Sequence, residues 1–373
     1  KMALPMVISM LVNSLYNIVD SFFVAQVSED AMTAISIVYP LQNLANAVGV
    51  GFGVGINAAV AYYLGAGSGK AANRSTTLGI ILSALHGIVL AGICVLLIRP
   101  FISMFTDSEE IVAYGLDYFY IVIAFAPVLT LGMAFEKVLQ ATGKMKTTMF
   151  CMAIGAVANI ILDPIFISGL GAIPAMGVFG AALATGIGQS LSLISYIAVF
   201  LLAKIPVRLR LERRGEEKIC RKLYYVGIPA SLNLALPSFM ITVLNAILAA
   251  FAEVYVLILG VYYKLQTYIY FTISGIVQGI RPLMSYNLGA GRKDRVMGIF
   301  KVTLLLSLGV MVIGTILCLA IPGQLMDIFT DTPQTVQQGA IALRIICAGF
   351  IVSRVSLGLS GTFQARGKGN ACL

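Results

Sequence analysis

The chain has 373 residues, of which 59% are hydrophobic and 11% charged, and its formal net charge is +9. A soluble domain carries about 25% charged residues, so this composition excludes a soluble globular protein. Apolar runs of about 20 residues, the length that crosses a hydrocarbon core of about 30 Å, recur along the sequence. Apolar and polar residues do not alternate within these runs, as they would in the strands of a membrane barrel. Because membrane helices satisfy their backbone polar groups internally, the runs predict an all-α polytopic membrane protein.

Breaks between the apolar runs predict ten membrane-spanning helices. In chain order they cover residues 3–27, 34–64, 76–98, 110–140, 147–168, 177–203, 223–250, 256–287, 296–320 and 334–363. Of the 25 Lys and Arg residues, 19 lie on the side of the N-terminus, and the opposite loops hold only Arg99. By the positive-inside rule we expect a cytoplasmic N-terminus. The positive charge then reflects topology and anionic lipid head groups rather than nucleic acid binding.

The sequence repeats itself at a constant offset of 224 residues. Coincident residues include Pro5 with Pro229, Ser14 with Ser238, Gln42 with Gln266, Gly51 with Gly275, Gly55 with Gly279, and LGAG at 64–67 with LGAG at 288–291. The first copy has six spans, so both copies enter the membrane in the same direction. This predicts two parallel six-helix bundles, related by a pseudo-two-fold axis along the membrane normal.

The repeat also predicts the domain boundaries. We expect an N-terminal lobe at 1–203, a basic cytoplasmic linker at 204–222 and a C-terminal lobe at 223–373. Leu373 corresponds to Met149, just before the fifth span of the first copy. The second bundle is therefore expected to be truncated in this sequence, with about ten of twelve helices present and helices 11 and 12 missing.

Four segments carry a resemblance to a known family: LPMVISMLVNSLYNIVDSFFVAQ at 4–26, NIILDPIFISG at 159–169, YYKLQTYIYF at 262–271 and RPLMSYNLGAG at 281–291. On these segments the chain resembles the multidrug and toxic compound extrusion (MATE) transporters, in their bacterial multidrug-efflux and DinF-like branch. The resemblance implies two lobes around a central cavity, in the bacterial cytoplasmic (inner) membrane. It also implies a monomeric antiporter that exports small organic, often cationic, compounds in exchange for H⁺ or Na⁺, with no cofactor.

Two carboxylates inside the predicted spans are the main candidates for function, because an ionisable group in the membrane is costly unless it is paired. Asp20 and Asp163 each lie a few residues from the outer end of a span, about 8–10 Å deep, and can meet at one level. Asn159 lies one turn before Asp163, and Tyr16 and Asn17 lie within a turn of Asp20. Such a pair is expected to bind protons as a coupled unit, and its oxygens could instead hold Na⁺.

The resemblance implies the same coupling residues, Asp20 and Asp163, with Asn159, Tyr16 and a hydroxyl on the sixth helix in support. Thr185 is the nearest match for that hydroxyl. Because Asp20 falls opposite Leu244 in the second copy, coupling is expected in the N-terminal lobe alone. The alternative is that each aspartate only holds neighbouring helices together through hydrogen bonds.

Other polar residues within the spans allow more than one interpretation. Pro5 is either a hinge of the first helix or a fixed entry turn. Glu136 and Lys137 are expected as a solvated gate pair near the cytoplasmic side, or as a surface pair. A substrate cavity is predicted to contain Lys264, Tyr263, Gln266, Gln42 and Tyr39.

Other classes of function are less well supported. The single histidine, His86, is expected to pack in the core, and there is no phosphate loop, metal-ligand spacing or nucleophile motif, so we do not expect an enzyme. A lipid-linked saccharide flippase of the same superfamily would favour several Arg in the first lobe, which the sequence lacks at mid-depth. A receptor or scaffold that transports nothing would not need the carboxylate pair.

Overall fold

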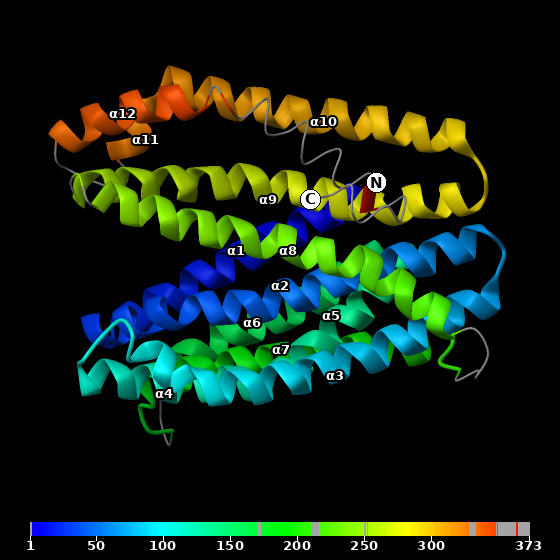
Figure 1. Cartoon of the computed structure of the whole chain (residues 1–373), viewed down its shortest axis with the longest axis horizontal. Coiled ribbons are helices and arrows are strands. Elements are labelled where there is room, and N and C mark those ends of the chain that lie inside the picture. The colour runs from blue at the N-terminus through cyan, green and yellow to red at the C-terminus, as the bar shows by residue number, and fades with distance from the viewer. Residues whose placement is uncertain are drawn as a thin grey trace.

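The computed structural model describes residues 2–169, 173–210, 216–249, 251, 253–327, 333–347, 349 and 363–364. In this part of the chain, long helices run nearly parallel to one axis and form a bundle (Figure 1). In chain order they are α1 (Ala3–Ala25), α2 (Glu29–Gly65), α3 (Gly69–Ile102), α4 (Glu109–Ala124), α5 (Ala126–Ala141), α6 (Met145–Ser168), α7 (Gly177–Leu202), α8 (Glu216–Ala249), α9 (Glu253–Gly289), α10 (Lys293–Ala320), α11 (Pro322–Asp327) and α12 (Pro333–Cys347).

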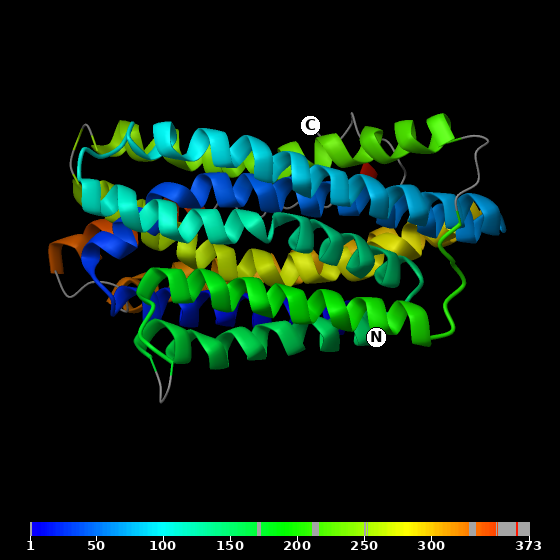
Figure 2. The same cartoon turned by 90° about the horizontal axis from the view of Figure 1, so that it is seen from below.

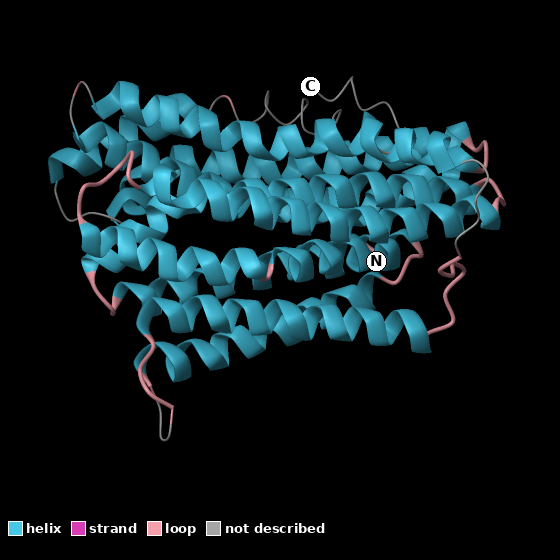
Figure 3. Ribbon diagram, turned by 60° about the horizontal axis from the view of Figure 1, so that its bottom comes forward, coloured by secondary structure: helices cyan, strands magenta, loops and turns pink. Residues whose placement is uncertain are grey.

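These helices agree with the predicted spans in order and position, and the all-α membrane fold is confirmed. Among the described residues, α1, α2, α3, α6, α7 and α10 are each long and apolar enough to cross a membrane. The pair α4 and α5 forms a further span with a bend of 43°. Most of the described loops lie at the two ends of the bundle (Figure 3).

One predicted span was wrong. The predicted span 110–140 is two helices with a break at Phe125, because Pro127 in the first turn of α5 has no N–H to donate to the Ile123 carbonyl of α4. The helix α8 begins at Glu216, so residues 216–222 of the predicted linker are helical. Much of the predicted span 334–363 lies outside the described residues.

The helices form two groups. The helices α2–α7 lie on one side in Figure 1 and α8–α12 on the other, and Figure 2 shows α6 and α7 side by side along its lower edge. The helix α1 packs against α6 in the first group and against α9 in the second. The reciprocal contact, between α2 and α8, also joins the groups. This is the arrangement that two parallel copies predict.

Glycines of α2 and α9 bring the two groups into backbone contact. A Cβ atom on Gly55 would collide with the backbone around Leu223 on α8, and one on Gly279 with the backbone around Ala3 on α1. Gly55 and Gly279 are counterparts in the repeat. Small residues at such a spacing allow membrane helices to approach closely.

Further contacts of the same kind come in counterpart pairs. A Cβ atom on Gly65 would strike the carbonyl of Tyr286, and one on Gly289 would strike the carbonyl of Tyr62. All of these contacts lie from the middle of α2 and α9 toward one end of the bundle. We call it the basic end, defined by the turns 66–68 and 290–292 and by the segment 203–210.

Candidate functional site

The centre of the site is Asp163 on α6, whose side chain is fully buried, with an exposed fraction of 0%. Asn159, one turn earlier, donates from Nδ2 to Asp163 Oδ1 over 3.1 Å and to the Thr185 hydroxyl of α7 over 3.4 Å. This contact depends on glycines, because a Cβ atom on Gly188 of α7 would lie 2.7 Å from the Gly155 carbonyl of α6. The two backbones therefore approach closely enough for Asn159 to reach Thr185.

Asp20 comes to the site from α1. It lines a cavity of about 150 Å³ together with Val24 of its own helix and four residues of α2, Met32, Ile35, Ser36 and Tyr39. Asp20 and Asp163 are close enough to interact electrostatically, and Tyr16 interacts electrostatically with both. The sequence-predicted residues Asp20, Asp163, Asn159, Thr185 and Tyr16 are thus brought together at the end of the bundle opposite the basic end.

Three oxygen atoms of this cluster are buried and accept no hydrogen bond: Asp20 Oδ1, Asp163 Oδ2 and Asn159 Oδ1. A buried acceptor left without a donor costs about 1–3 kcal/mol. A proton on a carboxylate, or a hard cation that takes only oxygen ligands, would satisfy these atoms. The donor set therefore fits H⁺ or Na⁺.

Sequence reasoning missed Tyr118 of α4. Its side chain is 3% exposed, its hydroxyl is hydrogen-bonded with the side chain of Gln42, and it interacts electrostatically with Asp20 and Asp163. One signal was available, since Tyr118 lies near the end of its span at the same side of the bundle as the two aspartates. A search restricted to charged side chains passes over it.

Two of the remaining candidates lie at the site, since Tyr39 lines the cavity beside Asp20 and Gln42 is hydrogen-bonded with Tyr118. Asn17 is exposed; its amide donates to the Asn13 carbonyl over 2.7 Å, and its side chain is hydrogen-bonded with that of Tyr16. In the second lobe, Tyr263 and Gln266 of α9 are the repeat counterparts of Tyr39 and Gln42. Gln266 donates to the hydroxyl of Tyr262 over 2.8 Å on its own helix. The side chain of Lys264 lies outside the described residues.

Pro5 stands near the start of α1, which begins at Ala3 in the described residues. Its carbonyl accepts a hydrogen bond of 2.9 Å from the buried Ser9 hydroxyl. A proline in a first turn frees no carbonyl within its own helix, which suits an entry turn. The hinge stays a prediction.

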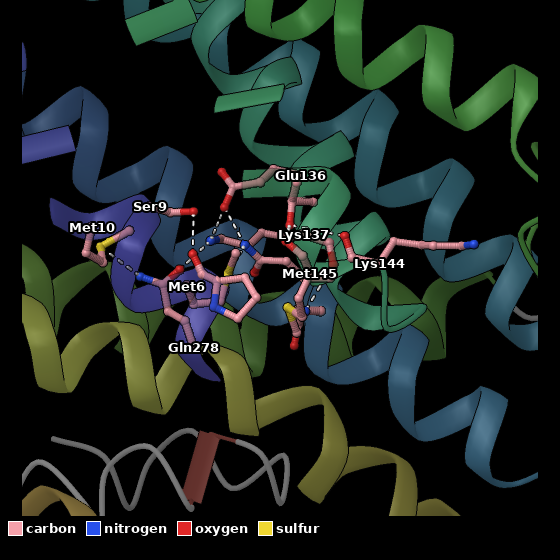
Figure 4. A network of polar contacts seen from close by, with 12 residues as sticks. Met6, Ser9, Met10, Glu136, Lys137, Lys144, Met145 and Gln278 are labelled. Atoms are coloured by element: carbon pink, nitrogen blue, oxygen red, sulfur yellow. Dashed lines mark hydrogen bonds and ion pairs between the residues drawn. The ribbon is translucent and has the colours of Figure 1, made fainter. Parts of the chain in front are cut away.

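The sequence predicted that Glu136 and Lys137 form a solvated gate pair or a surface pair. Both predictions are wrong, because the two side chains are buried. They are 7% and 3% exposed, and Lys137 Nζ donates to Glu136 Oε1 and to Gln278 Oε1 of α9, each over 2.9 Å (Figure 4). Glu136 also accepts from Gln140. The amides of Gln278 and Gln140 reach the sulfur atoms of Met10 and Met6 on α1. A buried ion pair thus joins the two groups of helices.

The single histidine lies at the same interface. The ring of His86 packs edge-on against Phe52, with 4.5 Å between ring centroids. Its Nε2 lies 2.9 Å from the Tyr224 hydroxyl of α8. This agrees with the interpretation of His86 as a packed histidine.

Comparisons with known proteins agree with this architecture. The MatE family model matches residues 5–165 and again residues 229–373, two matches that begin at repeat counterparts. The multidrug export protein MepA of Staphylococcus aureus (strain N315) is 28% identical over 375 residues, which cover 98% of this chain and 81% of MepA.

Solved structures of transporters share the fold. A multidrug resistance MATE family transporter of the MOP superfamily in an outward-facing conformation has a TM-score of 0.91 at 22% identity, covering 100% of this chain and 82% of that one. A MOP superfamily transporter from Pyrococcus furiosus, whose binding pocket is described as reversed in polarity, has a TM-score of 0.90 at 23% identity, over 100% of this chain and 82% of that one.

Proposed function

The chain belongs to the MatE family, and from this premise we propose that it is a cation-coupled antiporter that exports organic, cationic compounds across the bacterial inner membrane. The two lobes support this reading, and so does the likeness to MepA, which is a multidrug export protein. MatE proteins are transporters, so the carboxylate pair serves transport rather than catalysis.

The observation that carries the proposal is the set of unsatisfied oxygens on Asp20, Asp163 and Asn159. Binding of H⁺ or Na⁺ lowers the negative charge of the carboxylate pair and so relieves the repulsion between Asp20 and Asp163. The change reaches the other lobe through α1, because α1 packs on α6 at the site and on α9 across the interface. Occupancy of Asp20 thereby alters how the lobes sit against each other.

The domain boundaries and the orientation in the membrane belong to the same proposal. The lobes are residues 1–203 and 223–373, the linker is 204–222, and the N-terminus and the basic end face the cytoplasm. The glycine contacts keep the lobes together at the basic end. In this arrangement substrate leaves through the opposite half, where Tyr39 lines the cavity beside Asp20, and it is collected from the cytoplasm when the lobes part at the basic end. Gln42, Tyr263, Lys264 and Gln266 contribute further to the substrate cavity.

The test is efflux of a cationic dye from liposomes that contain the purified full chain, under an imposed gradient of pH or of Na⁺. Asp20→Asn removes the titratable group at nearly constant size and is expected to abolish gradient-driven efflux. Asp117→Asn makes the same change on α4 at an exposed position beside Tyr118, and is expected to leave efflux intact. Unimpaired efflux by Asp20→Asn at a fixed gradient would overturn the proposal.

A further inference from the structure

A lysine of α8 and two tyrosines of the first lobe meet near the basic end. Lys222 Nζ of α8 lies 3.6 Å from the ring centroid of Tyr62 and 4.3 Å from that of Tyr63, both on α2. The two rings are themselves in edge contact, with 5.5 Å between centroids and 81° between planes. One ammonium group therefore sits over two aromatic faces at once.

This geometry is the one by which proteins recognise organic cations. A cation within about 6 Å of a ring centroid is attracted by the negative face of the ring, and aromatic cages bind quaternary ammonium ligands in this way. Lys222 forms no ion pair with any described residue, so the tyrosine rings are the partners of its charge. The rings select a positive charge and an apolar body, and neither feature is peculiar to lysine.

The charged form of Lys222 loses hydration when it occupies this site. Lys222 precedes the predicted span 223–250, and burial lowers its pKa to about 8 because its charged form has lost water. An organic cation with its charge spread over an apolar body loses less hydration when it enters the same place. Such a ligand can compete with the lysine for the rings.

The position of the pair at the interface shows when the rings become free. A Cβ atom on Gly55 would strike the Leu223 carbonyl, next to Lys222, and the Tyr62 carbonyl lies against Gly289. Both rings belong to α2 in the first lobe, whereas Lys222 lies on α8, directly before the second lobe and on the same helix as its first residues. If the lobes part at the basic end, Lys222 leaves with α8 and the two rings stay behind.

We propose that Tyr62 and Tyr63 form a docking site for organic cations at the basic end of the N-terminal lobe, which Lys222 fills as an internal cation while the lobes are closed. This deepens the proposed function and rests on it, since export requires the lobes to open toward the side where substrate is collected. The site would receive a cation before it reaches the cavity beside Asp20. Closure would return Lys222 to the rings and prevent the cation from leaving by the way it came.

Equilibrium binding of tetraphenylphosphonium to the purified full chain, with no ion gradient, tests the proposal. Lys222→Met removes the internal cation and keeps the length of the side chain, so we expect binding at least threefold tighter than in the wild type. Lys218→Met, one turn earlier on the same helix and exposed, is the matched control and should change nothing. Equal affinities for the two variants would overturn the proposal.

A second set of variants assigns the binding to the rings. In the Lys222→Met background, Tyr62→Leu should remove the gain in affinity, whereas Tyr62→Phe, which keeps an aromatic face, should retain it. A gain that survives Tyr62→Leu would place the cation elsewhere and contradict the proposal. If Lys222→Met does not fold, Lys222→Gln serves in its place.

The docking site and the coupling function can fail separately. In an Asp20→Asn background, which abolishes efflux, Lys222→Met should still tighten tetraphenylphosphonium binding. Binding that responds to Lys222→Met in a chain that shows no gradient-driven efflux would refute the proposed function alone. Active efflux whose KM for the cation is the same with and without Lys222 would refute the docking site alone.

Discussion

Lys137 of α5 and Gln278 of α9 are joined by a hydrogen bond of 2.9 Å that crosses from one lobe to the other. The same ammonium group is paired with Glu136, and all of these atoms lie within the packed interface. Removing only one member of a buried ion pair is costly, because the other charge then stays buried without a partner.

Glu136→Gln is therefore expected to destabilise the protein by about 3–5 kcal/mol, because it leaves the Lys137 charge buried and unpaired. The double variant Glu136→Gln, Lys137→Met removes both charges and should recover most of this loss. Thermal unfolding in detergent, followed by circular dichroism, measures both. A double variant no more stable than Glu136→Gln would contradict this account of the pair.

Tyr118→Phe is expected to slow gradient-driven efflux several-fold, since a hydrogen bond between neutral groups is worth about 0.5–1.5 kcal/mol. The hydroxyl lost is the one bonded with Gln42 beside the carboxylate pair. Tyr120→Phe on the same helix, at an exposed position, is the control and should be silent. Dye efflux at one fixed gradient provides the comparison, and identical rates for the two variants would remove Tyr118 from the site.

Gly65→Ala is expected to weaken closure at the basic end, because the added methyl group meets the Tyr286 carbonyl. A cysteine introduced at Val7, in a background without the native cysteines, reports on closure through its reaction with a membrane-impermeant thiol reagent. The reaction should be several-fold faster in Gly65→Ala than with glycine at this position. Gly69→Ala, where a Cβ atom meets nothing within 4 Å, should leave the rate unchanged.

Cation binding at Tyr62 and Tyr63 is expected to weaken as the pH rises above about 8, the pKa to which burial lowers Lys222. When the lobes part, Lys222 enters water, where lysine has a pKa of about 10.4. Between these two values the closed arrangement holds fewer protons than the open one, so rising pH favours closure and the masking of the rings. Tetraphenylphosphonium titrations at pH 7 to 10 should show this trend in the wild type and not in Lys222→Met. A flat wild-type curve would contradict it.

Much of the fold was predictable because each helix must be apolar over a length that the membrane sets. The repeat added the lobes and their relative direction, since a constant offset relates Pro5 to Pro229 and Gly51 to Gly275. The bend at Phe125 was not foreseen, because a proline changes the direction of an apolar run without interrupting its hydropathy.

The site was predictable in part. Depth in the membrane indicated that Asp20 and Asp163 could meet, because depth follows from counting residues along each helix. The contact between Asn159 and Thr185 depends on how the helices rotate about their axes, which glycines on both surfaces decide. We expected Lys137 to be solvated because it lies near a helix end. In the structure α9 packs over it, and a contact between helices so far apart in sequence leaves no local sequence pattern.

The glycine contacts between the lobes also bear on how two copies of one ancestral unit diverged. Gly65 touches the backbone of the second copy and Gly289 that of the first, so each copy restricts what the other can become at these positions. Asp20 has no carboxylate as its counterpart in the second copy. The equivalent residue there is Leu244, which packs among apolar residues of its own lobe. Duplication thus preserved the surface that the copies share and left each interior free to specialise.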